Sequence, residues 1–480
     1  MWDFSEWEDQ IAVYEGNHVY TYRQLEMMQK KFSQYSIQRS LVCLVVKNDL
    51  ASLVGYVSCL QNHQPVMVLS ADSTISYREQ MWMRYRPQVI WMSRDCEQHH
   101  RAFFEQQGGY SKCKEAIPME WGTYTCYRST HKEIDPVNRE LALLLPTSGS
   151  TGNPKLVRIS YENIITNTKS ICAYMKLTGK DCAITALPLS YTYGLSVVNT
   201  ILYRGGRLCL TKESILSLSF WAQFERRKVT FLPGVPYTYF CMKKMNIRLE
   251  QYKALRILTQ AGGRLSEELQ KYWGEFARKN KKKLYIMYGQ TEATARISYL
   301  PPEVCLEKLG SVGLAIPGTE LRLVNDQRKT IEEPCQKGEV AVYGRHVSMG
   351  YAEHKEDLAK GYERKYRLYT GDIGYMDEEG YLYITGRKSR FAKLYGKRID
   401  LDDLERQLES IYDREIAAVS DDKIVYLVWE GNLQMPTDEI AERAKRIIGV
   451  MAVVESRVLD KIPRKENGKK DYRKILQSML

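Results

Sequence analysis

Short apolar runs alternate with polar, helix-forming stretches through most of the chain. Residues 41–46 and 66–69 are apolar enough to form buried strands. Between them, Asn48 and Asp49 stand where a helix N-cap is expected, ahead of a longer apolar stretch. Strand, helix and strand in this order predict a βαβ unit, in which a helix connects two parallel strands.

The same alternation returns in the middle of the chain. Residues 141–145 and 156–159 have strand patterns, and Ser160 is placed to cap a helix that begins near Tyr161. The other elements predicted here are strands at 255–259 and 284–287, a turn at 261–263 and a helix at 265–280. We therefore expect an α/β fold with a large N-terminal domain of βαβ-type layered sheets.

From about residue 318 the pattern changes to short strands and turns. Residues 375–376 and 381–384 flank turn-forming residues, as the strands of a hairpin do. The elements predicted after Arg387 are a helix with the face Leu401, Leu404, Leu408 and Ile411, strands at 416–419 and 424–429, and a helix at 438–448. We expect a β-rich subdomain within a large domain, residues 1–386, and a small mobile α+β domain, residues 387–480, joined to it by a hinge.

Length and composition limit the class of protein. The 480 residues are enough for more than one core, and 44% of them are hydrophobic. No apolar run approaches the roughly 18 residues that span a bilayer, so no membrane span is expected. The acidic start MWDFSEWED lacks the features of a secretory signal, and we expect a cytoplasmic protein. The 11 cysteines occur singly, which indicates neither a disulfide framework nor a zinc site.

The net charge of +12 favours anionic partners. Nucleic acid is one candidate, and ATP, coenzyme A or an acidic carrier protein would satisfy the same charge. Charge alone does not separate these possibilities, because a short basic run is most often a solvated face.

The segment TSGSTGNPK, residues 147–155, has the composition of a phosphate-binding loop and follows an apolar strand. Its glycines allow several backbone N–H groups to face one anion, its hydroxyls donate further hydrogen bonds, and Lys155 adds positive charge. It is not a Walker A loop, because Pro154 stands where that pattern requires glycine. Taken alone, the segment is also compatible with a flexible surface turn.

Three further motifs follow this loop in order. They are YGQTE at 288–292, YTGD at 369–372 with Gly386 and Arg387 after it, and NGK at 467–469. With the loop, they resemble the adenylate-forming superfamily of acyl-CoA synthetases, nonribosomal-peptide adenylation domains and luciferases, over residues 141–474.

The resemblance implies a binding site for ATP and Mg²⁺. Thr151 and Glu292 would hold the metal, Thr291 would contact the α-phosphate, and Lys469 would bridge the substrate carboxylate and that phosphate. Tyr288 would stack on adenine, and Asp372 with Arg387 would bind the ribose. The implied nucleotide-binding residues are Thr147, Ser148, Gly149, Ser150, Thr151, Gly152, Lys155, Gly262, Gly263, Tyr288, Gly289, Asp372 and Arg387.

The segment at 386–400 resembles the hinge and thioester-forming loop of the same superfamily, which implies a thiol step involving Lys393, Gly396 and Arg398. It departs from the common pattern at two positions. Ser389 stands at the hinge in place of aspartate or lysine, and Arg390 replaces an acidic residue.

The resemblance also indicates the acid. Gly194 stands at a position where amino-acid-activating relatives carry an aspartate that pairs with the substrate's ammonium group, so an α-amino acid is disfavoured. Tyr191 stands where many acyl-CoA synthetases have a histidine beside the acyl pocket, although a tyrosine that only packs is an equally open interpretation.

We expect an ATP-dependent acid–thiol ligase that forms an acyl-adenylate from an acyl, aryl or hydroxy acid rather than from an α-amino acid. A pantetheine thiol, of free coenzyme A or of an acyl carrier protein, then takes the acyl group. One alternative is an adenylate former that passes the acyl group to a non-thiol acceptor. Another is a catalytically silent nucleotide-binding protein; we do not expect nucleic acid as the partner.

Overall fold

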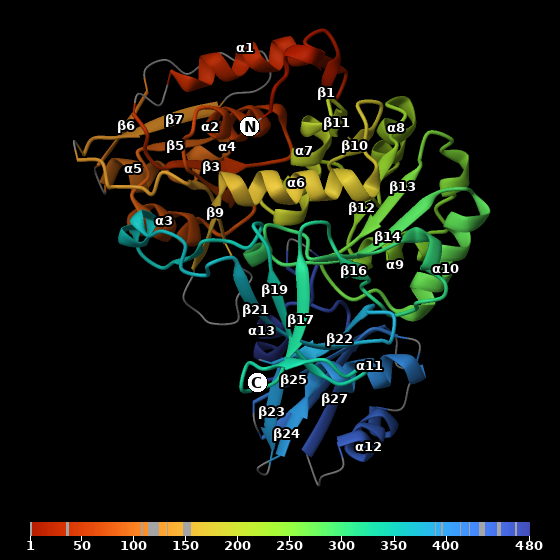
Figure 1. Cartoon of the computed structure of the whole chain (residues 1–480). Coiled ribbons are helices and arrows are strands. Elements are labelled where there is room, and N and C mark those ends of the chain that lie inside the picture. The colour runs from red at the N-terminus through yellow and green to blue at the C-terminus, as the bar shows by residue number, and fades with distance from the viewer. Residues whose placement is uncertain are drawn as a thin grey trace. The chain divides into compact units, whose positions relative to one another are not determined.

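The computed structural model describes residues 2–34, 38–106, 109–113, 124–131, 133–146, 155–388, 390–394, 397–412, 414–421, 423–431, 437–448, 453–465 and 468–480 (Figure 1). The chain divides into two compact units. The first unit contains Met1–Leu309, Ala315–Glu320 and Tyr343–Leu368, and the second contains Gly310–Leu314, Leu321–Val342 and Tyr369–Leu480.

An eight-stranded sheet forms one layer of the first unit. Its strands, in spatial order, are β20 (Gly350–Ala352), β9 (Leu156–Ser160), β8 (Leu141–Pro146), β4 (Val66–Ser70), β3 (Val42–Val46), β5 (Val89–Ser93), β7 (Tyr124–Ser129) and β6 (Tyr110–Lys112). The predicted βαβ unit is confirmed, because β3 and β4 are parallel and α2 (Leu50–Gln61) joins them. Asp49 caps α2 by accepting a hydrogen bond from the N–H of Ser52 at 3.1 Å.

The strands around the phosphate loop are arranged differently from a βαβ unit. β8 and β9 pair antiparallel, with Pro146 opposite Leu156, so the loop joins two neighbouring strands as a hairpin connection. The helix expected after Ser160 is present as α6 (Tyr161–Met175), and Ser160 and Asn163 form a capping box at its start. The sequence pattern thus located these elements but not the direction of their pairing.

A second sheet of the first unit contains β15 (Ser298–Leu300), β14 (Lys283–Tyr288), β13 (Ile257–Gln260), β12 (Phe231–Gly234), β10 (Cys182–Ile184), β11 (Arg207–Leu210), β1 (Ile11–Glu15) and β2 (His18–Thr21) in spatial order. The short strand β16 (Leu314–Ala315) lies where the chain passes between units. The other helices are α1 (Tyr22–Ser33), α3 (Ile75–Tyr85), α4 (Arg94–Gln98), α5 (Arg101–Gln106), α7 (Thr192–Tyr203), α8 (Leu218–Arg226), α9 (Pro236–Lys244) and α10 (Glu267–Lys279). Short 3-10 helices occur at Ser5–Trp7 (η1), Leu249–Gln251 (η2), Thr291–Ala293 (η3), Pro302–Val304 (η4) and Lys355–Ala359 (η5).

One continuous core fills the space between these two sheets. It contains residues of both sheets and of α2, α6 and α7. Leu50–Leu60 of α2 and Thr192–Leu202 of α7 are buried on every face, as expected for helices enclosed between layers. This packing fixes the first turn of α7 against the ends of β13 and β14, where the candidate site lies.

The second unit contains a β-rich sheet and an α+β part. The sheet has the order β18 (Thr330–Ile331), β17 (Glu320–Val324), β19 (Gly338–Tyr343), β21 (Arg367–Met376) and β22 (Leu382–Arg387). The α+β part has the hairpin β23 (Phe391–Leu394) and β24 (Lys397–Asp400), the sheet β25 (Ile416–Ser420), β26 (Ile424–Glu430) and β27 (Val453–Leu459), and the helices α11 (Leu401–Tyr412), α12 (Thr437–Ile448) and α13 (Tyr472–Gln477).

Alternating residues of β25 and β26 face two separate cores. Ile416, Ala418 and Leu427 pack with α11 and α12, whereas Ala417 and Val428 pack with the C-terminal segment. The helices and strands predicted after Arg387 are therefore confirmed. The second compact unit contains both the β-rich sheet and this α+β part. The domain boundary expected between residues 386 and 387 stays a prediction.

The helices of the described residues are all too short or too polar to cross a membrane. All 11 cysteines lie among the described residues, and they form no disulfide with one another.

Candidate functional site

The phosphate loop itself, with Thr147, Ser148, Gly149, Ser150, Thr151 and Gly152, lies outside the described residues. Its last residue, Lys155, is described and directly precedes β9. The ammonium of Lys155 lies 3.9 Å from the centroid of the Tyr351 ring, a cation–π contact. The C-terminal end of the loop is thereby linked to β20, which lies beside β9 in the sheet.

Glu292 lies in the short helix η3, directly after the YGQT residues, and its carboxylate is oriented by Tyr351. The Tyr351 hydroxyl donates to Glu292 Oε1 at 2.7 Å. Burial, and then the negative charge of Glu292, raises the pKa of Tyr351 to about 12, so the hydroxyl stays a neutral donor. The guanidinium of Arg364 lies 4.5 Å from the Tyr351 ring centroid and donates to Ser348 Oγ at 3.0 Å. Glu292 is therefore held by a tyrosine that contacts two cations, Lys155 and Arg364.

Arg158 fixes the backbone that carries Tyr351. The Arg158 side chain is fully buried in β9, donates to the carbonyl of Tyr351 at 2.9 Å and forms an ion pair with Glu363. Its other acceptors include the carbonyl of Gly361 at 3.2 Å. The sequence pattern showed a strand here, but it did not show that an arginine in that strand anchors the segment 351–363.

The carboxylate of Glu292 suits a magnesium ion that arrives with a nucleotide. Mg²⁺ in nucleotide-binding enzymes uses one or two protein carboxylates and takes its remaining ligands from phosphate oxygens and water. A cage of three or more His, Cys, Asp or Glu side chains, which would indicate a resident metal, does not occur among the described residues. One carboxylate, oriented by a tyrosine that also contacts Lys155, fits the first arrangement.

The residues expected around adenine come from two adjacent parallel strands. Gly262 and Gly263 follow β13, and Tyr288 ends β14, so they lie at the same edge of the sheet. Gly262 has φ +85°, and a Cβ there would lie 2.5 Å from the Tyr191 hydroxyl. A Cβ at Gly289 would lie 1.7 Å from the carbonyl oxygen of Ala295, so only glycine permits the turn after Tyr288.

The residues expected near the acid surround the first turn of α7. Tyr191 is its N-cap residue, and burial raises its pKa to about 12. The hydroxyl oxygens of Thr192 and Thr291 are 2.8 Å apart, so the threonine of the YGQTE motif contacts the first turn of α7. A Cβ at Gly194 would lie 2.2 Å from the Pro188 carbonyl oxygen, so this backbone leaves no space for an aspartate there.

Two residues at the first turn of α7, Tyr193 within the helix and Arg296 packed against it, belong to none of the four motifs. Tyr193 is buried and its hydroxyl contacts Thr259, with the hydroxyl oxygens 2.7 Å apart. Arg296 is also buried and stacks on the Tyr193 ring at 4.0 Å. An arginine only four residues beyond Glu292 was visible in the sequence, but its burial was not.

The second unit brings together the two residues expected to bind ribose. Asp372 of β21 lies opposite Arg387 of β22, and Arg387 Nε donates to Asp372 Oδ1 at 2.8 Å. Asp372 is buried, whereas the Arg387 side chain is 53% exposed. The ion pair keeps the Asp372 carboxylate in a fixed orientation.

The thiol-step residues are only partly described. Ser389 and Gly396 lie outside the described residues, and the backbone of Lys393 pairs with that of Arg398 in the β23–β24 hairpin.

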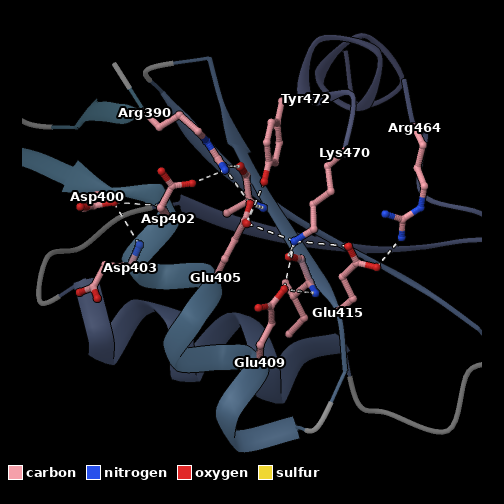
Figure 2. Close-up of polar contacts among 12 residues, drawn as sticks. Arg390, Asp400, Asp402, Asp403, Glu405, Glu409, Glu415, Arg464, Lys470 and Tyr472 are labelled. Carbon is pink, nitrogen blue, oxygen red and sulfur yellow. Dashed lines mark hydrogen bonds and ion pairs between the residues drawn. The ribbon is translucent and has the colours of Figure 1, made fainter. Parts of the chain in front are cut away.

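Arg390, the departure from the family pattern, has a structural environment of its own (Figure 2). It forms ion pairs with Asp402 and Glu405 of α11, and its guanidinium carbon lies 3.5 Å from the Tyr472 ring centroid. Burial disfavours its charge, but the carboxylate of Glu405, followed by Tyr472 and Asp402, holds the Arg390 pKa above its usual value. Through these contacts Arg390, which directly precedes β23, is linked to α11 and to Tyr472 of α13.

Lys469 lies on a tight turn that buried charges anchor. Lys465 N–H donates to the Lys469 carbonyl at 2.8 Å, and Gly468 has φ +78°. The next residue, Lys470, has a side chain that is 12% exposed, and its ammonium lies 3.1 Å from Glu405 and 3.0 Å from Glu409 (Figure 2). Lys470 is thus a structural lysine, and Lys469, which is also half-buried, lies beside it in the chain.

A model of the AMP-binding enzyme family matches residues 2–352. The medium-chain fatty-acid–CoA ligase of Escherichia coli (strain K12) is 28% identical over 347 residues, which are 69% of this chain and 60% of the ligase. The oxalate–CoA ligase of Arabidopsis thaliana is 31% identical over 54% of this chain and 50% of its own length. The 2-succinylbenzoate–CoA ligase of Geobacillus sp. (strain WCH70) is 25% identical over 86% of this chain and 82% of its own length. The chain thus spans about half to three fifths of the first two relatives.

Two groups of solved structures have the same fold. ATP-bound MatB from Rhodopseudomonas palustris superposes with a TM-score of 0.81 at 19% identity, covering 99% of this chain and 97% of MatB. O-succinylbenzoate coenzyme A synthetase (MenE) from Bacillus subtilis, in complex with AMP, gives 0.78 at 20% identity, covering 98% of this chain and 96% of MenE. These similarities confirm the expected α/β fold with a large N-terminal and a small C-terminal domain. Because the family model matches residues 2–352, which are most of this chain, the chain belongs to the AMP-binding enzyme family.

Proposed function

We propose that this protein is an ATP-dependent, AMP-forming ligase that joins a carboxylic acid to a pantetheine thiol. The observation that carries the proposal is the orientation of Glu292 by Tyr351, between Lys155 at the end of the phosphate loop and Arg364. Relatives named as fatty-acid, oxalate and 2-succinylbenzoate CoA ligases support the same reaction class.

The first half-reaction joins two anions. The substrate carboxylate attacks the α-phosphorus of ATP, an acyl-adenylate forms, and pyrophosphate leaves. Positive charge must offset the repulsion between the reactants, and fixed donors do this better than mobile ones. Lys155 and Arg364 supply charge beside Glu292, and Glu292 is the carboxylate that would hold Mg²⁺. When bound, the metal would neutralise charge on the departing phosphates.

We assign the remaining roles by the same reasoning. Gly262, Gly263 and Tyr288 would contact adenine, Thr291 the α-phosphate, and Asp372 with Arg387 the ribose. Lys469 would contact the reacting carboxylate during adenylation. Lys393, Gly396 and Arg398 would serve the second half-reaction, in which the thiol displaces AMP, after a rotation at Ser389.

Coenzyme A is the proposed thiol, because it is the acceptor named for the relatives. A phosphopantetheine arm on an acyl carrier protein has the same reactive end and is the alternative acceptor. We propose an acid without an α-amino group, since a Cβ at Gly194 would meet the Pro188 carbonyl oxygen at 2.2 Å and an aspartate there would not fit.

The test is exchange of radioactive pyrophosphate into ATP across a broad panel of acids, with and without Mg²⁺. We expect exchange that needs both an acid and Mg²⁺, and AMP release with thioester formation when coenzyme A is added. Exchange without thioester on either acceptor would support a non-thiol acceptor. Lack of exchange with every acid would contradict the proposal and support a nucleotide-binding protein without ligase activity.

A further inference from the structure

Arg296 is a buried cation for which the described residues provide no acidic partner. The residue is 3% exposed, its guanidinium lies over the Tyr193 ring at 4.0 Å, and its Nε donates to the sulfur of Met287 at 3.3 Å. Within the described part of the chain, no carboxylate lies within ion-pair distance of this guanidinium. A ring face and a thioether are both weak partners for a full positive charge.

The other buried arginines of the described residues are better satisfied. Arg158 has Glu363 and several carbonyl oxygens, and Arg78 donates to the carbonyl of Ala71 at 2.7 Å and to His100 Nε2 at 3.0 Å. Removing a charge from water without a counter-charge costs several kcal/mol. Of the three, Arg296 is therefore the one whose environment is incomplete without an anion.

Two contacts fix where Arg296 lies. Asn167 of α6 holds its backbone on both sides, donating to the Arg296 carbonyl at 3.0 Å and accepting from its N–H at 3.4 Å. The sulfur of Met287, which directly precedes Tyr288, binds the guanidinium from β14. Arg296 is therefore attached to the strand that ends at the proposed adenine site.

The guanidinium faces the first turn of α7. The Tyr191 and Tyr193 rings are 6.2 Å apart, and Tyr193 lies under the guanidinium. Burial raises the pKa values of Tyr174, Tyr191 and Tyr193, and the charge of Arg296 opposes this effect at all three. The positive end of the α7 dipole adds to the same charge, because α7 has no side-chain cap.

We infer that Arg296 binds a second carboxylate of the acid substrate, so that the enzyme activates dicarboxylic acids in preference to monocarboxylic acids of the same length. The inference rests on the proposed function, because it names the acid that the ligase would adenylate. The guanidinium offers a planar pair of donors that matches a carboxylate, and a bound carboxylate would supply the counter-charge that the described residues do not provide.

The surrounding residues favour a short diacid. Thr192 lies between Tyr191 and Tyr193 in the chain, and its hydroxyl contacts that of Thr291, the residue proposed to meet the α-phosphate. The reacting carboxylate and the second carboxylate would then lie beside Thr192 and Tyr193, two neighbouring residues in the first turn of α7. Tyr193 is a positioning residue here, since Thr259 fixes its hydroxyl and its ring supports the guanidinium.

The kinetic test compares matched acids with the full-length enzyme. Pyrophosphate exchange is measured with malonate against propionate, succinate against butyrate and glutarate against valerate. We expect one diacid to be preferred over its matched monoacid by about 10²-fold in kcat/KM. Arg296→Met should remove this preference mainly by lowering kcat/KM for the diacid, as expected for loss of one member of a buried charge pair. Arg296→Lys should retain part of it. Arg139→Gln, which removes an exposed arginine of the same unit, is the matched control.

A binding measurement separates recognition from catalysis. Calorimetry with 5′-O-(N-acylsulfamoyl)adenosines carrying succinyl or butyryl groups reports affinity without turnover. The wild type should bind the succinyl compound more tightly, and Arg296→Met should bind the two alike. Thermal unfolding of Arg296→Met should be unchanged or improved, since no internal ion pair is lost; if this variant does not fold, Arg296→Gln replaces it.

The outcomes distinguish the inference from the proposed function. The inference would be overturned if the enzyme exchanged pyrophosphate with monoacids as fast as or faster than with diacids, and if Arg296→Met did not change these rates. The ligase activity would still stand. An equal rise in the KM for ATP with every acid would also overturn the inference, because Arg296 would then bind the nucleotide. Failure of every acid would contradict the ligase itself.

Discussion

At the scale of single residues, Tyr351 is the side chain that orients the proposed metal ligand. Its hydroxyl donates to Glu292 Oε1 at 2.7 Å, and Arg158 fixes its backbone carbonyl at 2.9 Å. Its pKa of about 12, raised by burial and by Glu292, keeps the proton on the hydroxyl throughout the physiological range. Residues that hold a metal ligand in place affect metal affinity almost as strongly as the ligand does.

We predict that Tyr351→Phe weakens the response to Mg²⁺. Removing the hydroxyl frees Glu292 Oε1 to adopt other orientations, so the Mg²⁺ concentration for half-maximal pyrophosphate exchange should rise by about 10-fold. The exchange rate at saturating Mg²⁺ should fall much less. Glu292→Gln should lower exchange by about 10² to 10³ at all Mg²⁺ concentrations, because it removes the proposed ligand charge itself.

Tyr366→Phe is the matched control for this prediction, since Tyr366 donates to Glu162 at 3.0 Å near the surface of the same unit. It should leave the Mg²⁺ titration unchanged. A wild-type Mg²⁺ titration for Tyr351→Phe would remove Tyr351 from this role, and wild-type exchange for Glu292→Gln would remove Glu292 from the metal site.

The sequence identified Glu292 but not its partner, for a physical reason. Glu292 belongs to a motif of five adjacent residues, whereas Tyr351 is 59 positions away and reaches it only because β20 pairs with β9. Arg296 was equally hidden, because burial of an arginine depends on Asn167 and Tyr193, which lie on two different helices. Local patterns reveal motif residues, and non-local packing supplies the residues that orient them.

At the scale of elements, local signals predicted positions well and pairing poorly. The capping box at Ser160 fixed the start of α6, and alternating apolar residues located β25 and β26. The antiparallel pairing of β8 with β9 was not predicted, because strand direction depends on the partner and not on the strand's own residues. The ion pairs of Arg390 and Lys470 with α11 were also not predicted, because charged residues usually indicate a solvent-exposed position.

Lys470 joins three of these elements, and we predict that Lys470→Met destabilises the second unit. Its ammonium lies 3.1 Å from Glu405 and 3.0 Å from Glu409 of α11 and contacts the carbonyl of Ile416 in β25 (Figure 2). Burial disfavours the charged form of Lys470, but Glu405, followed by Tyr472 and Glu409, holds the Lys470 pKa above its usual value. Removal would leave the buried Glu405 carboxylate and the half-buried Glu409 carboxylate without this partner, which costs about 3 kcal/mol. Urea denaturation and hydrogen exchange of β25 and β26 measure the effect.

Two variants test the cause of this destabilisation. Lys470→Met combined with Glu409→Gln should recover part of the lost stability, because it also removes a carboxylate left unpaired. Lys461→Met, at an exposed lysine in the same basic stretch, should change the free energy of unfolding little. A Lys470→Met midpoint equal to that of the wild type would show that the ion pairs only offset their own desolvation.

At the scale of the whole molecule, the proposed site residues are divided between the two units. The first unit carries Glu292, Thr291 and Arg296, and the second carries Asp372, Arg387 and Lys469. Four motifs in the right order were enough to predict the family and its fold. The proposed division of labour between half-reactions is tested by the kinetics of the separate steps.

We predict that Lys469→Ala impairs only the first half-reaction. If Lys469 stabilises charge while the adenylate forms, its removal should slow adenylation by about 10² to 10³. Transfer from synthetic acyl-adenylate to coenzyme A should proceed at nearly the wild-type rate, because the proposed rotation at Ser389 would withdraw Lys469 before the second step. Rapid-quench measurement of each half-reaction separates the two rates. Lys461→Ala is the control, since it removes an exposed lysine of the same segment.

A bulky residue at Gly396 should have the opposite effect. Gly396→Trp should obstruct the proposed pantetheine path while adenylation continues, so the two variants together form a crossed pair. Equal damage to both half-reactions by Lys469→Ala would contradict the use of separate C-terminal residues for the two steps. Intact adenylation would exclude Lys469 from the site, even though the Lys470 anchor and the Gly468 turn hold it in a defined position.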